Sequence, residues 1–309
     1  MIEVQELTKR YGDFEAIRDV SFSIGKGEIV GFLGPNGAGK TTTMRILSCF
    51  MPPTSGSGNI AGYDLFKDSL EVRKRIGYLP EHPPLYPEMT VRAYLLFVAT
   101  IKGVVARDRK AKLAKVIEQC SLIEVQHRLI GHLSKGYRQR VGIAQALIHD
   151  PEVVILDEPT IGLDPAQIID IRHLIRGLAG ERTIILSTHI LPEVSMLCSR
   201  VIIIHRGRVL ASDAYEKLTS ERVQGQRLHL KARGLDVERL RSLPGVVSVQ
   251  SQDVESCLIE AEPEKEMREA VSRYVISQGW GLLELTSQSL SLEEVYLKLI
   301  SESEGGYSA

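Results

Sequence analysis

The sequence predicts an α/β fold built on a largely parallel sheet, followed by a small α+β domain. Two observations point to this. Up to about residue 215, short apolar runs rich in β-branched residues alternate with longer segments of helical spacing, which is the pattern of a parallel sheet with crossover helices. From about Val223, the runs change to shorter strands and helices. We place the boundary between Leu218 and Gln226 and expect domains at 1–220 and 226–300, with a disordered tail at 301–309.

The first domain begins with an antiparallel segment and continues with buried strands. Alternating apolar residues from Ile2 to Ile24, with turns at Gly12 and at 25–27, predict an antiparallel edge. Brief, apolar, β-branched runs predict strands at Ile29–Leu33, Val153–Leu156, Thr183–Ser187 and Val201–His205. Helical spacing covers Tyr137–His149 and Ala166–Leu178.

The second domain has the predicted order β-α-β-β-α-β, which suggests a ferredoxin-like fold. Its expected elements are a strand at 228–232, a short helix at 237–243, a hairpin of 247–249 and 258–260, a helix at 267–275 and a strand at 282–285. A last helix is expected to begin at Ser291, because Glu294 three residues later completes a capping box.

Composition restricts the class of protein. A chain of 309 residues can bury a large core, so it needs no disulfide, and its four cysteines form no CxxC pair. The net charge of -1 gives no basic footprint for nucleic acid. No apolar run approaches the ~20 residues that a spanning helix needs, and the first residues do not resemble a signal peptide. We expect a soluble protein, or one held at a membrane by a partner.

The segment GPNGAGKT, residues 34–41, carries the strongest chemical signal. It follows a predicted strand and precedes a helical pattern, which is the context of a P-loop. Glycines let backbone amides close around phosphate, and the helix N-terminus favours the same anion. Lys40 adds a charge at the β- and γ-phosphates, and the Thr41 hydroxyl can bind Mg²⁺. The other predicted nucleotide-binding positions of the loop are Asn36, Gly37, Ala38, Gly39 and Thr42.

Two acids end the strand Val153–Leu156. Ligands gather at the carboxyl ends of strands in open α/β sheets, so Asp157 can hold Mg²⁺ opposite Thr41. Glu158, one residue farther on, can orient or deprotonate the attacking water near the γ-phosphate. The pair therefore predicts a magnesium-dependent hydrolytic site.

These residues, together with further motifs over about 1–215, resemble the ATP-binding subunit of ABC transporters, with Walker A and Walker B segments. The resemblance implies that Tyr11 stacks on adenine. LSKGYRQR, residues 133–140, is similar to the family signature, with Ser134 and Gly136 matching, while Lys135 and Tyr137 depart from it. As the N-cap of a helix, Ser134 would complete a second anion site, which in the family reaches the γ-phosphate of a second subunit.

Other matching segments imply further roles. IGLDP, residues 161–165, resembles the D-loop with Asp164 as its acid, and the histidine of STH, His189, is expected to contact the γ-phosphate and the attacking water. Glu81 stands where the family usually has Gln, and it would bind Mg²⁺ or a water. The residues after Val91 are expected to form a helical subdomain, and in transporters a groove near there receives the membrane subunit. The C-terminal stretch resembles the small domain of ABC-2-type exporter ATPases.

The resemblance implies an ATPase that uses ATP and Mg²⁺ and energises an ABC-2-type membrane exporter. Two copies, or one copy and a paralogous subunit, would close head to tail on two ATP molecules, and a separate integral membrane permease would hold the pair at the cytoplasmic face of the membrane. Lys40, Glu158 and His189 are the predicted catalytic residues; Thr41, Asp157 and Glu81 are the predicted Mg²⁺ ligands. No nucleic acid partner is expected.

Two alternatives stay open at this point. A soluble ABC-class ATPase acting on ribosomes or DNA would share the same motifs, although such proteins usually carry two cassettes or long coiled coils, which this sequence lacks. A P-loop kinase or GTPase would not need the signature helix, and no NKxD-type motif occurs in the chain.

Overall fold

The computed structural model describes residues 1–220, 226–262, 266–288 and 290–305, which form two compact units, Met1–Tyr215 and Glu216–Ala309. The first unit ends at Tyr215, three residues before the interval Leu218 to Gln226 in which the sequence predicted the domain boundary. Within the described residues, no helix is both long and apolar enough to cross a membrane.

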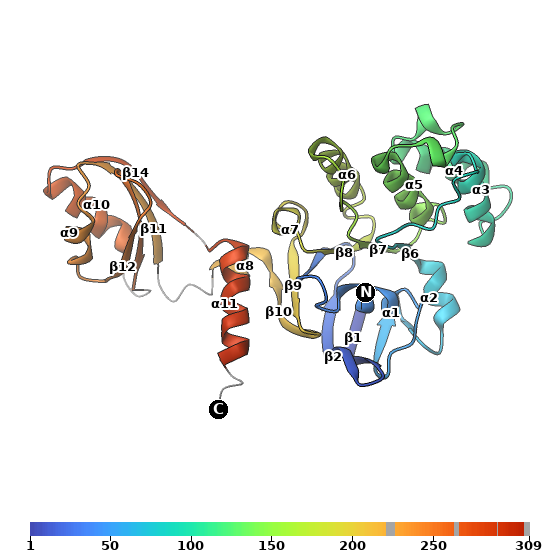
Figure 1. The fold of residues 1–309 in the computed structure, drawn as a ribbon, viewed down its shortest axis with the longest axis horizontal. Helices are drawn as coiled ribbons and strands as arrows, with labels where there is room; N and C mark the ends of the chain where they lie inside the picture. The colour runs from blue at the N-terminus through green and yellow to red at the C-terminus, as the bar shows by residue number, and fades with distance from the viewer. Residues whose placement is uncertain (221–225, 263–265, 289, 306–309) are drawn as a thin grey trace. The chain divides into compact units, whose positions relative to one another are not determined.

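A six-stranded sheet forms the centre of the first unit, in the order β10-β9-β3-β8-β7-β6 (Figure 1). The strands are β3 Ile29–Leu33, β6 Ile76–Leu79, β7 Val153–Asp157, β8 Thr183–Thr188, β9 Arg200–His205 and β10 Arg208–Ala214. All neighbours are parallel except β9 and β10. The four predicted core strands are confirmed, and β3, β7 and β8 are buried along their whole length. Their carboxyl ends therefore meet at one edge.

The N-terminal strands pair antiparallel as predicted, but they form a separate sheet and not an edge of the parallel sheet. Strands β1 Ile2–Tyr11, β2 Phe14–Ile24, β4 Ser55–Ile60 and β5 Tyr63–Asp64 pair in the order β2-β1-β4-β5. Helix α1, Lys40–Leu47, buries Met44 and Leu47 in one core with apolar residues of both sheets, such as Leu7 and Phe32. Because α1 must be covered on two sides, the N-terminal strands cover its second side and do not extend the parallel sheet.

Helices surround the parallel sheet (Figure 1). They are α2 Ser69–Arg75, α3 Val91–Ile101, α4 Arg109–Gln119, α5 Lys135–Leu147, α6 Pro165–Gly177 and α7 Leu191–Leu197, with short 3₁₀ turns η1 Ile123–Val125 and η2 Ile130–His132. Helix α8, Tyr215–Ser220, follows β10 and belongs from Glu216 on to the second unit. Helices α3, α4 and α5 pack on one another and form the expected helical subdomain. Helix α5 starts two residues before the predicted position, since Ser134 caps it.

The second unit has the predicted order of elements. They are β11 Gln226–Arg233, α9 Val237–Arg241, β12 Val246–Ser251, β13 Ser256–Ala261, α10 Met267–Ser277 and β14 Gly281–Ser287. The antiparallel sheet has the order β12-β13-β11-β14, which is the ferredoxin-like arrangement, and both helices bury apolar residues in its core. The capping box is present, because the Ser291 amide donates to Glu294 Oε2 at 2.9 Å and the Glu294 amide donates to Ser291 Oγ at 3.2 Å.

The last helix, α11, spans Leu292–Gly305 and differs from the predicted disordered tail at 301–309. The hydroxyls of Ser301 and Ser303 each donate to the carbonyl three residues earlier, which accommodates serine within a helix. Residues 306–309 lie outside the described residues.

Candidate functional site

The phosphate-binding loop turns at Gly39, which caps helix α1 in a left-handed conformation with φ +103°. A Cβ atom on this glycine would lie 2.5 Å from the Ile17 side chain and 2.8 Å from the Ala16 carbonyl oxygen. Only glycine combines this backbone angle with this close approach to β2. The loop residues therefore wrap the N-terminus of α1, where unpaired amides favour an anion.

A cavity of about 390 Å³ opens over this loop. It is lined by Tyr11, Phe14, Ala16, Asn36, Gly37, Gly39, Lys40, Thr41, Thr42, Glu81, Glu158 and Ile161. Nine of these lining residues are site residues predicted from the sequence. Phe14, Ala16 and Ile161 were missed; the aromatic pair in YGDF was the available signal for Phe14, because Phe14 lies opposite Tyr11 across the β1–β2 turn. Ala38 does not line the cavity and is buried in the core.

Tyr11 lies at the rim of the cavity and is half exposed. Its hydroxyl donates to Met51 Sδ at 3.1 Å, and the Lys9 ammonium stands 5.4 Å from the ring centroid. Phe14 is 65% exposed. The mouth of the cavity thus offers two aromatic faces to a planar group, next to a loop that favours phosphate.

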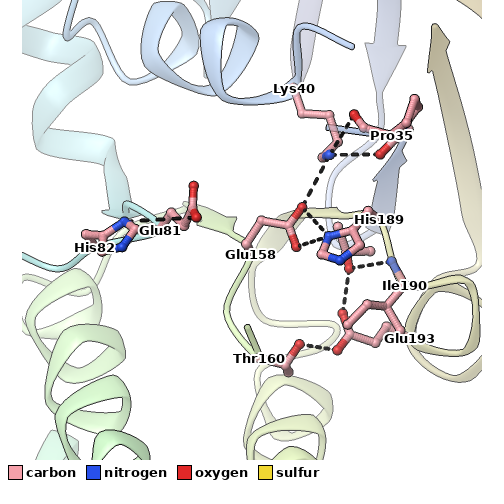
Figure 2. Close-up of polar contacts among 11 residues, drawn as sticks. Pro35, Lys40, Glu81, His82, Glu158, Thr160, His189, Ile190 and Glu193 are labelled. Atoms are coloured by element: carbon pink, nitrogen blue, oxygen red, sulfur yellow. Dashed lines mark hydrogen bonds and ion pairs between the residues drawn. The ribbon is translucent and has the colours of Figure 1, made fainter. Parts of the chain in front are cut away.

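Lys40 joins the loop to Glu158, the acid that follows β7 (Figure 2). Its Nζ donates to the carbonyl oxygens of Gly34 at 2.8 Å and Pro35 at 3.2 Å. The same nitrogen lies 3.3 Å from Glu158 Oε1, and both side chains are almost completely buried. Removing either charge would leave the other buried with one counter-charge fewer.

His189 approaches Glu158 from the end of β8. Its Nδ1 lies 3.0 Å and 2.9 Å from the two carboxylate oxygens, so in this hydrogen bond Nδ1 carries the proton and donates (Figure 2). Glu158 itself has φ +48°, a left-handed angle that is uncommon for a residue with a side chain. Its amide is held by the Ser187 carbonyl oxygen at 2.9 Å. The carboxylate is therefore fixed by backbone and side chain together.

Asp157 is fully buried at the end of β7, and within the described residues no donor reaches either carboxylate oxygen with full hydrogen-bond geometry, although the Ser187 and Thr41 hydroxyls lie beside it. Burial raises the pKa of this carboxyl, and the nearby charges of Glu158 and Glu81 raise it further, while the hydroxyls of Ser187 and Thr41 oppose the shift. Two neighbouring hydroxyls do not offset the burial of this charge, so the carboxylate needs a counter-charge.

The donors around Asp157 fit Mg²⁺. Hydroxyl and carboxylate oxygens come together from Thr41, Asp157 and Glu81, and these are the hard ligands that this ion prefers. Within the described residues, no three His, Cys, Asp or Glu side chains form a metal cage. Such a cage is not expected, because Mg²⁺ in phosphate sites takes only one or two carboxylates and completes its shell with phosphate and water.

The signature residues lie outside the cavity lining. The Ser134 hydroxyl accepts a hydrogen bond from the Tyr137 amide at 3.4 Å, so Ser134 caps α5 as predicted. A Cβ on Gly136 would lie 2.6 Å from the Gln167 side chain of α6. Asp164 caps α6 by accepting from the Gln167 amide at 2.9 Å. A single chain therefore does not bring Ser134 or Gly136 to its own phosphate loop.

Comparisons with known proteins find relatives over almost the whole chain. The family model described as ABC transporter matches residues 17–161. The chain is 35% identical over 302 residues to the bacitracin transport ATP-binding protein BcrA of Bacillus licheniformis, with 97% of each chain covered. It is 32% identical over 304 residues to the linearmycin resistance ATP-binding protein LnrL of Bacillus subtilis, covering 97% of this chain and 98% of the relative.

Among solved structures, the chain matches the dimeric post-hydrolysis state of the ATP-binding cassette MJ0796 bound to ADP and Pi. The TM-score is 0.63 and the identity 27%, with 69% of this chain and 98% of the other covered.

Proposed function

The chain belongs to the ATP-binding subunits of the ABC transporter family, and we propose that it couples ATP hydrolysis to an ABC-2-type exporter in the membrane. The observation that carries the proposal is the union, in one cavity, of the phosphate loop, Lys40 and Glu158. Relatives that match nearly the whole chain are named for bacitracin transport and linearmycin resistance, which supports export.

Hydrolysis follows from the arrangement of the site. The amides of the loop and the Lys40 ammonium bind the β- and γ-phosphates, so Lys40 exchanges its loop carbonyl partners for phosphate oxygens. Glu158 accepts a proton from water as the water oxygen attacks the γ-phosphorus, and the bond to the β-phosphate oxygen breaks to give ADP and phosphate. His189 donates to Glu158 and keeps the carboxylate aimed at the water.

Mg²⁺ accompanies the nucleotide in this proposal. Asp157 and Thr41 would hold it, with Glu81 as a further oxygen ligand, because the buried Asp157 carboxylate has no cationic partner in the described structure. When bound, the ion neutralises charge on the phosphate oxygens.

A second subunit completes the site. Ser134 lies at the exposed N-terminus of α5, away from the cavity of its own chain, so its anion-binding amides are available to another copy. Two copies, or one copy and a paralogous subunit, then close head to tail around two ATP molecules. The dimeric state of the matched cassette supports this arrangement.

A groove of about 330 Å³ lies beside the helical subdomain. Ser48, Cys49, Phe50, Arg73, Ile76, Tyr78, Val98, Lys102, Gln145 and Ala146 line it. Phe50 is 72% exposed at its rim. Burial and the charge of Arg73 lower the pKa of Lys102, and neither cation has a carboxylate within 4.0 Å in the described structure. We assign the groove to an apolar segment of the permease that carries an acidic side chain, which would hold the chain at the cytoplasmic face of the membrane.

Two assays on the purified chain test the proposal. Turnover of Mg-ATP should be lost in Lys40→Ala, and affinity capture from detergent-solubilised membranes should recover a protein with several spanning helices. Capture of ribosomes or DNA in place of a membrane protein would replace the transport proposal with the ribosome- or DNA-acting alternative. Absence of ATP turnover in the parent chain, both alone and with its captured membrane partner, would contradict the hydrolytic assignment.

A further inference from the structure

A fully buried carboxylate lies next to the site without contacting the cavity. Glu193 belongs to the first turn of α7 and has no exposed surface. Its Oε2 accepts a hydrogen bond from the Thr188 hydroxyl at 2.7 Å, and its Oε1 accepts one from the Thr160 hydroxyl (Figure 2). Both threonines are themselves buried.

The hydrogen bonds account for every polar atom of this cluster. A carboxylate accepts at both oxygens, and each threonine hydroxyl has one proton to donate. The Thr188 oxygen also accepts from the Ile190 amide at 3.0 Å, so it acts as donor and acceptor at once. Hydrogen bonds to an ionised acceptor in a buried site are stronger than hydrogen bonds between neutral groups. The bridge formed by Thr160, Glu193 and Thr188 is therefore stiff.

The bridge joins the two chain segments that carry Glu158 and His189. Thr160 follows Glu158 by two residues in the turn after β7, where the Ile161 amide donates back to the Glu158 carbonyl oxygen at 3.2 Å. Thr188 directly precedes His189 at the end of β8. One carboxylate therefore ties the turn that holds the base to the strand end that holds its histidine partner.

We infer that Glu193 is a positioning residue, which sets the distance between the segments of Glu158 and His189 and thereby keeps the Glu158 carboxylate aimed at water. The inference rests on the proposed roles of Glu158 and His189 in hydrolysis. Glu158 has an uncommon left-handed backbone angle, so its orientation depends on such external restraints. Small displacements of a reacting group cost large factors in rate.

The test is Glu193→Ala, with Thr160→Val and Thr188→Val as variants that each remove one arm of the bridge at nearly constant volume. We expect kcat to fall on the order of 10–100-fold in Glu193→Ala, by analogy with the range found when hydrogen bonds that orient metal ligands are removed. The KM for ATP and the equilibrium binding of a non-hydrolysable ATP analogue should stay within about twofold, since no member of the bridge lines the cavity. Each valine variant should show a smaller fall in kcat, and Glu193→Gln should retain more activity than Glu193→Ala.

A matched control separates positioning from a loss of stability. Asp150 pairs with the buried Arg182 at 2.6 Å at the opposite edge of the sheet, ahead of β7 and β8. Asp150→Ala should lower the melting temperature and leave kcat within about twofold of the parent at a temperature well below melting. If the variants of Glu193, Thr160 and Thr188 lower only the melting temperature, as this control does, the inference is overturned.

Glu158→Gln, measured in parallel, distinguishes this failure from a failure of the proposed function. Turnover that survives Glu158→Gln contradicts the base assignment and with it the bridge. Turnover that is lost in Glu158→Gln but kept in Glu193→Ala, Thr160→Val and Thr188→Val contradicts the bridge alone.

Discussion

Lys40 and Glu158 form a buried ion pair, with 3.3 Å between Nζ and Oε1. The pair places the cation of the phosphate loop against the carboxylate assigned as the base. The γ-phosphate of ATP and the Glu158 carboxylate are both anions, so they compete for the same ammonium group. Binding of nucleotide therefore has to weaken this pair, and the base is released from Lys40 at the same step.

Glu158→Gln separates the two roles of this carboxylate. The amide is neutral, so ATP no longer competes with a buried anion for Lys40, and we expect ATP to bind as tightly as to the parent or up to about tenfold more tightly. Turnover should fall by roughly 10²–10⁴, the usual contribution of a general base. Nucleotide titration and single-turnover hydrolysis measure the two effects. Weaker binding together with unchanged turnover would reverse the assignment.

Asp157 makes stability depend on pH and on magnesium. The pKa of Asp157 in the folded chain lies above its ordinary value. At a pH below the ordinary pKa, its contribution to folding stability is therefore fully present. This contribution is lost as the pH rises through the folded-state pKa. At neutral pH the buried charge is thus a cost in the metal-free chain. Asp157→Asn removes it and should raise the metal-free melting temperature by about 2–4 °C, the shift that ~1 kcal/mol gives in a domain of this size.

Mg-ATP should reverse this order of stability, so that the parent melts at a higher temperature than Asp157→Asn. The parent should gain more thermal stability from Mg-ATP than from ATP with a chelator, and the difference should shrink as the pH falls and Asp157 becomes protonated. Asp157→Asn should show little difference between the two conditions. Differential scanning fluorimetry across the pH range measures both chains. Equal magnesium responses in the two chains would show that Asp157 does not hold the ion.

The core strands were predictable because each is a continuous apolar run between turn signals, as in β3 and β7. Strand β6 was missed, because it is short, contains Gly77 and precedes Pro80. The glycine has a tertiary cause, since a Cβ at this position would lie 2.1 Å from the Ala146 carbonyl oxygen of α5. Such a requirement for close packing between a strand and a distant helix leaves no periodicity in the local sequence.

The residues of the cavity also divide into those that local sequence motifs predict and those that only the fold brings together. Lys40, Thr41 and Glu158 lie in local motifs whose spacing already implies phosphate chemistry, and they line the cavity together. Ile161 is an apolar residue of a turn, and its role depends only on where the turn lies. Glu193 follows His189 by four residues, a spacing without chemical meaning until the fold brings Thr160 and Thr188 to its two oxygens.

The groove proposal gives a prediction by charge reversal. Lys102→Glu places an acid where we expect an acidic side chain of the permease, so recovery of the membrane protein by affinity capture should fall at least about tenfold, the effect of losing roughly 1.4 kcal/mol of affinity. Lys110→Glu, on the neighbouring helix α4 and outside the groove, is the matched control and should leave recovery unchanged. Equal recovery with both variants would exclude the groove as the docking surface.

The central claim is that two copies share each ATP, with the phosphate loop of one chain and the Ser134 helix of the other on the same terminal phosphate. Light scattering after size-exclusion chromatography of Glu158→Gln with Mg-ATP tests it most directly. We predict a species of twice the 34.3 kDa chain mass with Mg-ATP, a single-chain mass with ADP, and loss of the dimer when Ser134→Arg is added. A chain that binds Mg-ATP to saturation and keeps its single-chain mass would contradict the claim.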